Sequence, residues 1–103
     1  GIETLNNLRI LALSQNSISD LSPLNQMSEL STLLIDFNQV SVLTPIKNLE
    51  NLRGLYANNN LLAEDSSVIE MNQLAELYIY DNNLTDNRIV EIQEALPSVR
   101  IEF

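Results

Sequence analysis

The 103-residue sequence predicts an α/β solenoid, in which similar coils stack and each coil contributes one short strand to a parallel sheet. A phrase of leucines and isoleucines occurs four times, it recurs every 22 residues, and an asparagine follows each copy. A constant period of about 20 to 50 residues is the signature of stacked-repeat architectures. The copies begin at Leu8, Leu30, Leu52 and Leu74.

The strands are predicted from the alternation within each phrase, because aliphatic residues at every second position suit a strand with one buried face. Aligning the phrases gives two aliphatic columns, and a segment near the C-terminus extends both. The first column is Leu11, Leu33, Leu55, Leu77 and Val99, and the second is Leu13, Ile35, Ala57, Ile79 and Ile101. We therefore expect about five short parallel strands.

An asparagine follows each of the first four predicted strands, at Asn16, Asn38, Asn60 and Asn82. The chain turns inward there, which leaves backbone groups in a dry place where they need hydrogen-bond partners. An asparagine side chain has donors and an acceptor, so it can bridge its own turn and the neighbouring coil. We predict a structural asparagine ladder rather than a ligand site.

The return path of each coil has aliphatic columns of its own. Pro23 and Pro45 occupy matching places in this path, within the segments LSPL and LTPI. Proline fixes φ and restricts the residue before it, so we expect extended, non-helical backbone at these two points. The side opposite the sheet should be mostly irregular, with single turns at most.

The repeat pattern L-x-x-L-x-L-x-x-N-x-I-x-x-L-x-P-L-x-x-L-x-x-L resembles the 22-residue leucine-rich repeat. The segments ISDLSPL and VSVLTPI are similar to the internalin-type repeats of bacterial surface proteins. The resemblance covers nearly the whole chain. It implies a curved, right-handed coil whose parallel sheet lines a concave face, and it implies that the chain binds a macromolecule.

The last repeats depart from this pattern, because neither keeps the proline and the fourth carries a helical spacing. Thr85 or Asp86 can cap a helix whose face contains Ile89, Ile92 and Leu96. Pro97 follows and should stop that helix. A final helix followed by a strand resembles the end of many bacterial leucine-rich repeat domains, so we expect a C-terminal cap over residues 85–103.

The organisation expected is a single leucine-rich repeat domain over residues 1–103, representing the C-terminal part of a longer array. Ile2 and Leu5 match the return path of a preceding coil. Solenoid ends expose apolar core and an unpaired strand edge unless they are capped. Self-association through the N-terminal edge, along Leu8 to Leu13, is therefore a second expectation.

Composition excludes several functions. The sequence has no histidine, no cysteine and only two glycines, so we expect no catalytic residue, no metal site, no phosphate-binding glycine loop and no cofactor. Its net charge of −9 argues against nucleic acid, which demands a basic surface, and favours a basic partner or simple solubility. No apolar stretch is long enough to span a membrane.

The residues between the core leucines should point onto the concave face, and all five aromatic residues fall in these outward columns. Tyrosine is enriched at binding hot spots, which favours a protein-binding patch. Stacking across strands is the structural alternative, and Phe37 or Phe103 could pack inward instead. The candidate binding residues are Leu34, Asp36, Phe37, Tyr56, Asn58, Glu76, Tyr78, Tyr80 and Asp81.

These observations favour a non-enzymatic, internalin-like protein-binding module at the surface of a bacterium or secreted from it. An intracellular regulator of the phosphatase-regulator class, with a cytoplasmic location, is the alternative. A structural stacking segment whose concave face binds nothing is the third. The sequence does not distinguish the partner.

Overall fold

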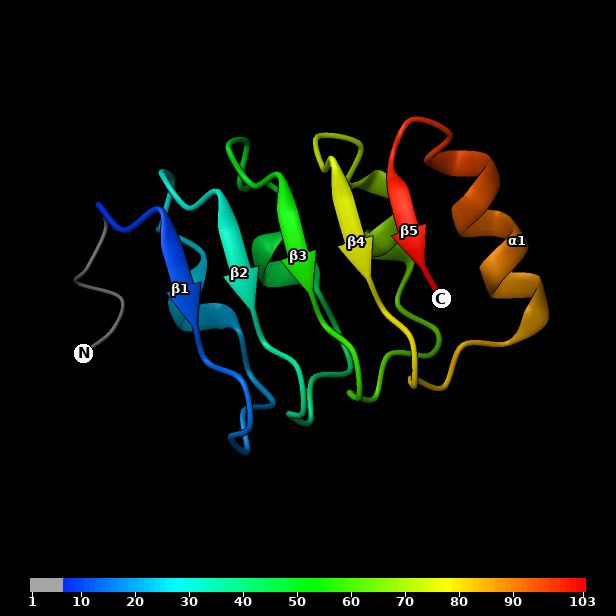
Figure 1. The fold of residues 1–103 in the computed structure, drawn as a ribbon, viewed down its shortest axis with the longest axis horizontal. Helices are drawn as coiled ribbons and strands as arrows, with labels where there is room; N and C mark the ends of the chain where they lie inside the picture. Colours follow the sequence, from blue (N-terminus) through cyan, green and yellow to red (C-terminus); the bar gives the residue numbers. More distant parts are fainter. Residues whose placement is uncertain (1–6) are drawn as a thin grey trace.

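Five parallel strands form one sheet in chain order in the computed structural model, which describes residues 7–103 (Figure 1). The strands are β1 (Ile10–Ala12), β2 (Thr32–Leu34), β3 (Gly54–Tyr56), β4 (Glu76–Tyr78) and β5 (Arg100–Glu102). The strands lie side by side, and the return segments lie behind them. The predicted solenoid with a parallel sheet is confirmed, whereas the expectations for Ile2 and Leu5 lie outside the described residues.

The strand register follows the sequence period through the first four coils. Leu11 pairs with Leu33, Leu33 with Leu55, and Leu55 with Leu77. These side chains point away from solvent, and the last three are fully buried. The core is built from aliphatic residues and methionines stacked coil upon coil, because each short strand can bury only one face.

Three 3-10 helices form the return path, and they correct the expectation of extended backbone at the prolines. They are η2 (Ser22–Leu24), η3 (Thr44–Ile46) and η4 (Ser66–Glu70). Pro23 and Pro45 lie in the first turn of η2 and η3. Proline is compatible with this position because its fixed φ suits the turn and an N–H there has no partner within the helix. The expectation of single turns is confirmed.

The C-terminal helix α1 (Asp86–Ala95) begins and ends where the sequence predicts. The Thr85 hydroxyl accepts a hydrogen bond from the Arg88 backbone N–H at 3.2 Å and so caps the helix. Ile92 and Leu96 are buried against the last coil, and Pro97 follows. The helix packs beside η4 and covers this end of the core (Figure 1).

The last coil contains 24 residues rather than 22, which corrects the predicted columns. Leu77 pairs with Ile101, not with Val99, and Glu76 pairs with Arg100. A full α-helix rises only about 1.5 Å per residue, so the coil needs two further residues to return to the sheet. Phe103 consequently follows Ile79 by 24 residues and packs against the core, so it does not join the outward-facing aromatics.

Three of the four asparagines that follow the strands, Asn38, Asn60 and Asn82, bond the backbone of two coils. The Asn38 amide donates to the carbonyls of Leu13 and Ile35, both at 2.9 Å, and its oxygen accepts from the Ile18 N–H at 3.0 Å. Asn60 and Asn82 repeat this arrangement one and two coils later. Asn16 donates to carbonyls of its own turn.

Candidate functional site

The sheet face, defined here as the solvent-facing side of β1 to β5, carries two stacked tyrosines at its centre. Tyr56 and Tyr78 are register partners on β3 and β4. Their ring centroids are 4.8 Å apart and their planes differ by 15°. This separation equals the usual spacing of neighbouring strands, so the sheet register itself sets the stack. Both residues are half-buried.

Glu76 joins the two tyrosines into one unit, which we call the tyrosine–glutamate cluster (Tyr56, Glu76 and Tyr78). The Tyr56 hydroxyl donates to Glu76 Oε1 and the Tyr78 hydroxyl to Oε2, each at 3.3 Å. Glu76 lies two residues before Tyr78 on the same face of β4. Both rings therefore lean back along their strands toward the carboxylate.

Gly54 provides the space into which the Tyr56 ring leans. A Cβ atom at this position would lie 3.3 Å from Cε2 of Tyr56. Such a contact is tight, and the ring could not yield freely because Tyr78 stacks on it. Gly54 is therefore part of the site, and the sequence contained a signal for it, since glycine in a strand marks a close approach.

The cluster alters the ionisation of one of its members. Desolvation raises the pKa of the Tyr56 hydroxyl above its ordinary value, and the negative charge of Glu76 and its hydrogen bond raise it further. The Arg100 guanidinium acts in the opposite direction. The Tyr56 hydroxyl thus remains a neutral donor to Glu76 well above neutral pH.

Asp36 and Asn58 connect neighbouring coils through their side chains. Asp36 Oδ1 accepts from the Asn58 backbone N–H at 2.9 Å, and Asn58 Oδ1 accepts from the Tyr80 backbone N–H at 2.9 Å. Asn58 is only 7% exposed. The expectation that Asn58 is displayed to solvent is therefore wrong, because this side chain satisfies a backbone donor of the next coil.

The remaining candidate residues lie along the ends of the strands. Phe37 is 54% exposed and Tyr80 is 43% exposed, so neither packs inward. Asp81 is exposed, and its carboxylate accepts from the Asn59 amide at 3.4 Å. Leu34 is half-buried on β2. Among residues 7–103, the aromatic rings that contact one another are those of Tyr56 and Tyr78, so the expected patch divides into a central stack and a separate rim.

Charged side chains of β5 complete the sheet face, and sequence reasoning missed their placement because it misaligned this strand. Arg100 is the register partner of Glu76, and Glu102 is the partner of Tyr78. The Nε atom of Arg100 lies 3.9 Å from a carboxylate oxygen of Glu102. Within the five described strands, two carboxylates, those of Glu76 and Glu102, accompany one guanidinium, that of Arg100, so the strands carry a net negative charge.

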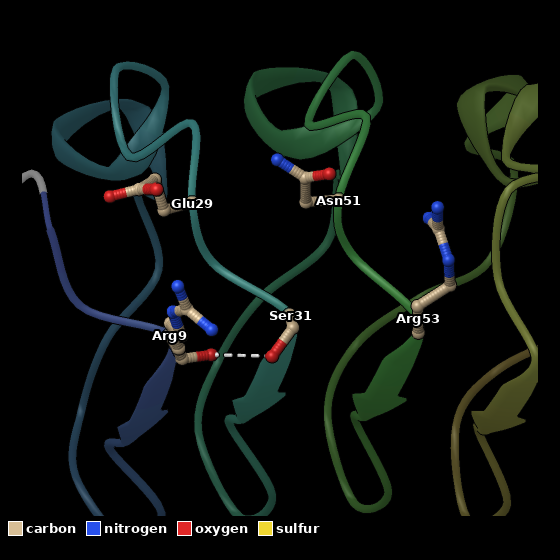
Figure 2. A pocket seen from close by; sticks show the side chains of 5 residues that line it. All are labelled: Arg9, Glu29, Ser31, Asn51 and Arg53. Carbon is tan, nitrogen blue, oxygen red and sulfur yellow. Dashed lines mark hydrogen bonds between the residues drawn. The ribbon is translucent and has the colours of Figure 1, made fainter.

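A surface hollow lies where the chain enters the strands, and it is lined by Arg9, Glu29, Ser31, Asn51 and Arg53 (Figure 2). The Ser31 hydroxyl donates to the Arg9 carbonyl at 3.0 Å, which fastens the first two coils together. The Arg53 guanidinium donates to three backbone carbonyls. The hollow contains charges of both signs, and the Arg53 guanidinium is already hydrogen-bonded to the backbone, so we interpret this hollow as structural.

Within residues 7–103, no three histidine, cysteine or acidic side chains gather closely enough to hold a metal ion. In the same part of the chain, no helix has the length and hydropathy needed to cross a membrane.

Comparison with solved structures shows which known proteins share this arrangement of coils. An internalin, InlF, of Listeria monocytogenes aligns with 99% of this chain at 29% identity, with a TM-score of 0.89. Internalin C2 of the same bacterium aligns over 99% at 33% identity, with a TM-score of 0.86. The chain has an internalin-like leucine-rich repeat fold. No family model and no curated protein matches the sequence.

The internalin-like chain spans only part of each solved relative, covering 30% of InlF and 44% of internalin C2. A leucine-rich repeat protein of Leptospira interrogans also aligns over 99% of this chain, with a TM-score of 0.71 and 33% of that protein covered. At 21% identity, this third likeness concerns the fold alone. The predicted resemblance to internalin-type repeats is confirmed.

Proposed function

We propose that this internalin-like chain is a non-enzymatic protein-recognition module whose partner binds the sheet face, which we expect to be the concave one. The observation that carries the proposal is the separation of residue types between core and surface. Aliphatic residues fill the interior, whereas Phe37, Tyr56, Tyr78 and Tyr80 lie on or beside the sheet face. Tyrosine supplies a large, rigid contact area with a polar tip, which is why it is enriched at binding hot spots.

The backbone at Phe37 supports a binding role for the rim. Phe37 adopts a left-handed conformation with φ of 58°, and its ring is 54% exposed. This conformation is unfavourable for a bulky side chain and suits asparagine or aspartate better. Packing does not explain the residue, because the ring covers little of the core. An interface that requires an exposed aromatic ring at this point would explain it.

Electrostatics indicate the kind of partner. The chain carries a net charge of −9, and the acidic side chains of the sheet face outnumber its one guanidinium. Complementary charge accelerates association and disfavours partners of like charge. We therefore propose a basic protein partner. The similarity to Listeria internalins supports a location at the surface of a bacterium or in its surroundings, although an intracellular adaptor would use the same face.

A structural role is the second candidate, because the Tyr56–Tyr78 stack and its bonds to Glu76 also stabilise adjacent coils. In that case the tyrosines would strengthen the sheet without contacting another molecule. The two functions differ in what happens when the rings are removed. A spacer would lose stability alone, whereas a recognition module would lose its partner while remaining folded.

The test is selection of ligands from a phage-displayed library of random 15-residue peptides, followed by mapping of their footprint by amide chemical shifts. We expect enriched peptides to perturb the sheet face and to bind the Tyr56→Ala/Tyr78→Ala double variant at least about tenfold more weakly. The control is Leu61→Ala/Val90→Ala, which removes two exposed apolar side chains away from the sheet face. Footprints elsewhere, or equal losses in both double variants, would contradict the proposal.

A further inference from the structure

The tyrosine–glutamate cluster holds a carboxylate in a fixed position between the polar tips of two rings. Each oxygen of Glu76 accepts one tyrosyl hydroxyl, at 3.3 Å in both cases. An ionised carboxylate can accept about four hydrogen bonds, so acceptor capacity remains on both oxygens. The rings are fixed as well, because they stack on each other at 4.8 Å. The cluster is therefore organised before any ligand arrives.

Among the described residues, Arg100 is the register partner of Glu76, but its guanidinium does not form an ion pair with the Glu76 carboxylate. Arg100 pairs with Glu76 across the sheet, yet the salt bridge that its guanidinium makes in the described residues is to Glu102, at 3.9 Å. The Arg100 side chain is 68% exposed, which is typical of a loosely held surface group. Glu76 is thus a half-buried carboxylate whose described hydrogen-bond partners are two neutral hydroxyls.

A cation is the ligand that suits both parts of the cluster. The face of a tyrosine ring attracts positive charge through its quadrupole, and a carboxylate beside the ring attracts it directly. A guanidinium is planar, so it can lie against a ring while its N–H groups donate in the plane to a carboxylate. The ammonium group of lysine is more strongly hydrated and is not planar, so it cannot lie flat against the ring and donate to the carboxylate at the same time.

We propose that the tyrosine–glutamate cluster is the receptor for an arginine side chain of the protein partner. This inference rests on the proposed function, since it names the partner group that the sheet face recognises. The Glu76 carboxylate would pair with the guanidinium, and the plane of the guanidinium would lie against a ring face that the Tyr56–Tyr78 stack leaves uncovered. The rim at Phe37 and Tyr80 would contact neighbouring parts of the same partner.

The probe is a nine-residue peptide of alanine and serine with one central arginine, blocked at both ends, together with its lysine and citrulline counterparts. The peptides contain no aromatic residue, so the ring signals of Tyr56 and Tyr78 report binding without interference. We expect the arginine peptide to shift these signals, the lysine peptide to bind several-fold more weakly, and the citrulline peptide not to bind measurably.

Glu76→Gln should weaken the arginine peptide about tenfold while preserving the fold, which circular dichroism checks. Glu94→Gln, on the exposed surface of α1, removes the same charge away from the sheet face and should change the affinity less than about twofold. Equal effects of the two substitutions, or equal binding of the three peptides, would overturn the inference. Library-selected peptides that still occupy the sheet face would in that case leave the proposed function intact.

Discussion

In each of the first four coils, the third residue after the end of the strand adopts a left-handed backbone conformation. The four residues are Gln15, Phe37, Asn59 and Asp81, with φ between 55° and 60°. Asparagine and aspartate tolerate this conformation because their short side chains bond locally, whereas glutamine and phenylalanine gain no such compensation. The fold therefore imposes one backbone geometry on four different side chains, and its cost differs from coil to coil.

Phe37→Asn should raise the free energy of unfolding by about 1 kcal/mol, because it relieves the left-handed strain at little cost in buried area. Urea denaturation measures the change. Gln15→Asn, at the same position of the first coil, is the matched control for strain without an aromatic ring and should stabilise similarly. If both variants are stabilised but only Phe37→Asn loses selected peptide ligands, the ring serves binding. A destabilised Phe37→Asn would show that the ring packs more than its exposure implies.

Tyr56 should titrate later than an ordinary tyrosine, because burial and the Glu76 charge raise its pKa. The folded state holds this proton more tightly than the unfolded state, so the stabilisation is complete below the unfolded pKa of about 10. It is then lost as the pH rises through the folded value. Absorbance of tyrosinate against pH measures the ionisation, and Glu76→Gln should move the late step toward lower pH. An unchanged titration in that variant would contradict the role of Glu76.

At the scale of the element, each coil is defined less by its three-residue strand than by the turn that closes it. A strand of three residues forms few backbone hydrogen bonds with its neighbours, and after β2 the side chain of Asn38 adds bonds to two coils at once. The last coil closes differently: its return path contains the helix α1, and the chain takes 24 residues to return to the sheet. The element chosen for the return path therefore decides the register of the next strand.

Asn60→Ala should lower the free energy of unfolding by about 1–3 kcal/mol, because it leaves buried backbone groups of two coils without partners. Asn60 is 5% exposed, and its amide donates to the carbonyls of Ile35, Ala57 and Asn58. Asn16→Ala is the control, since Asn16 is exposed and its described bonds stay within one turn. Thermal and urea denaturation compare the two. Equal losses would mean that the link between coils contributes little.

At the scale of the whole molecule, the chain is a row of coils, 38 × 27 × 17 Å, in which each coil contacts its neighbours. Stability in such an array is close to a sum of coil and interface terms. The central coils are covered on both sides by neighbouring coils, and α1 covers the outer side of the last coil. Leu13 and Ile18 of the first described coil are only half-buried, whereas Ile35 and Val40 of the second are fully buried. The array should therefore open from the β1 side.

Amide hydrogen exchange should show this gradient directly. The Ala57 N–H, which donates to the Tyr78 carbonyl at 2.7 Å in the centre of the array, should exchange much more slowly than the Leu13 N–H, which donates to Leu34 at 2.8 Å. The two hydrogen bonds have similar lengths, so bond geometry does not account for a difference. Uniform protection across the coils would indicate that the molecule opens as one cooperative unit instead.

The repeat, the parallel sheet, the aliphatic core and the capping helix could all be predicted from the sequence. Each follows from a local period of apolar residues that only one periodic structure can bury. The asparagines could also be assigned, because a polar residue that recurs at a buried turn must satisfy backbone groups.

The register of β5, the inward packing of Phe103 and the hydrogen bonds among Tyr56, Glu76 and Tyr78 became known only from the three-dimensional structure. A column alignment assumes equal coils, and the length of a coil depends on how its return path folds and packs. The direction in which the Tyr56 ring leans depends on the space at Gly54, two residues earlier on its own strand, and on the carboxylate of Glu76, which lies one coil further along the chain. The contacts of Tyr56 with Glu76 and with Tyr78 arise between coils, and the repeat period carries no information about them.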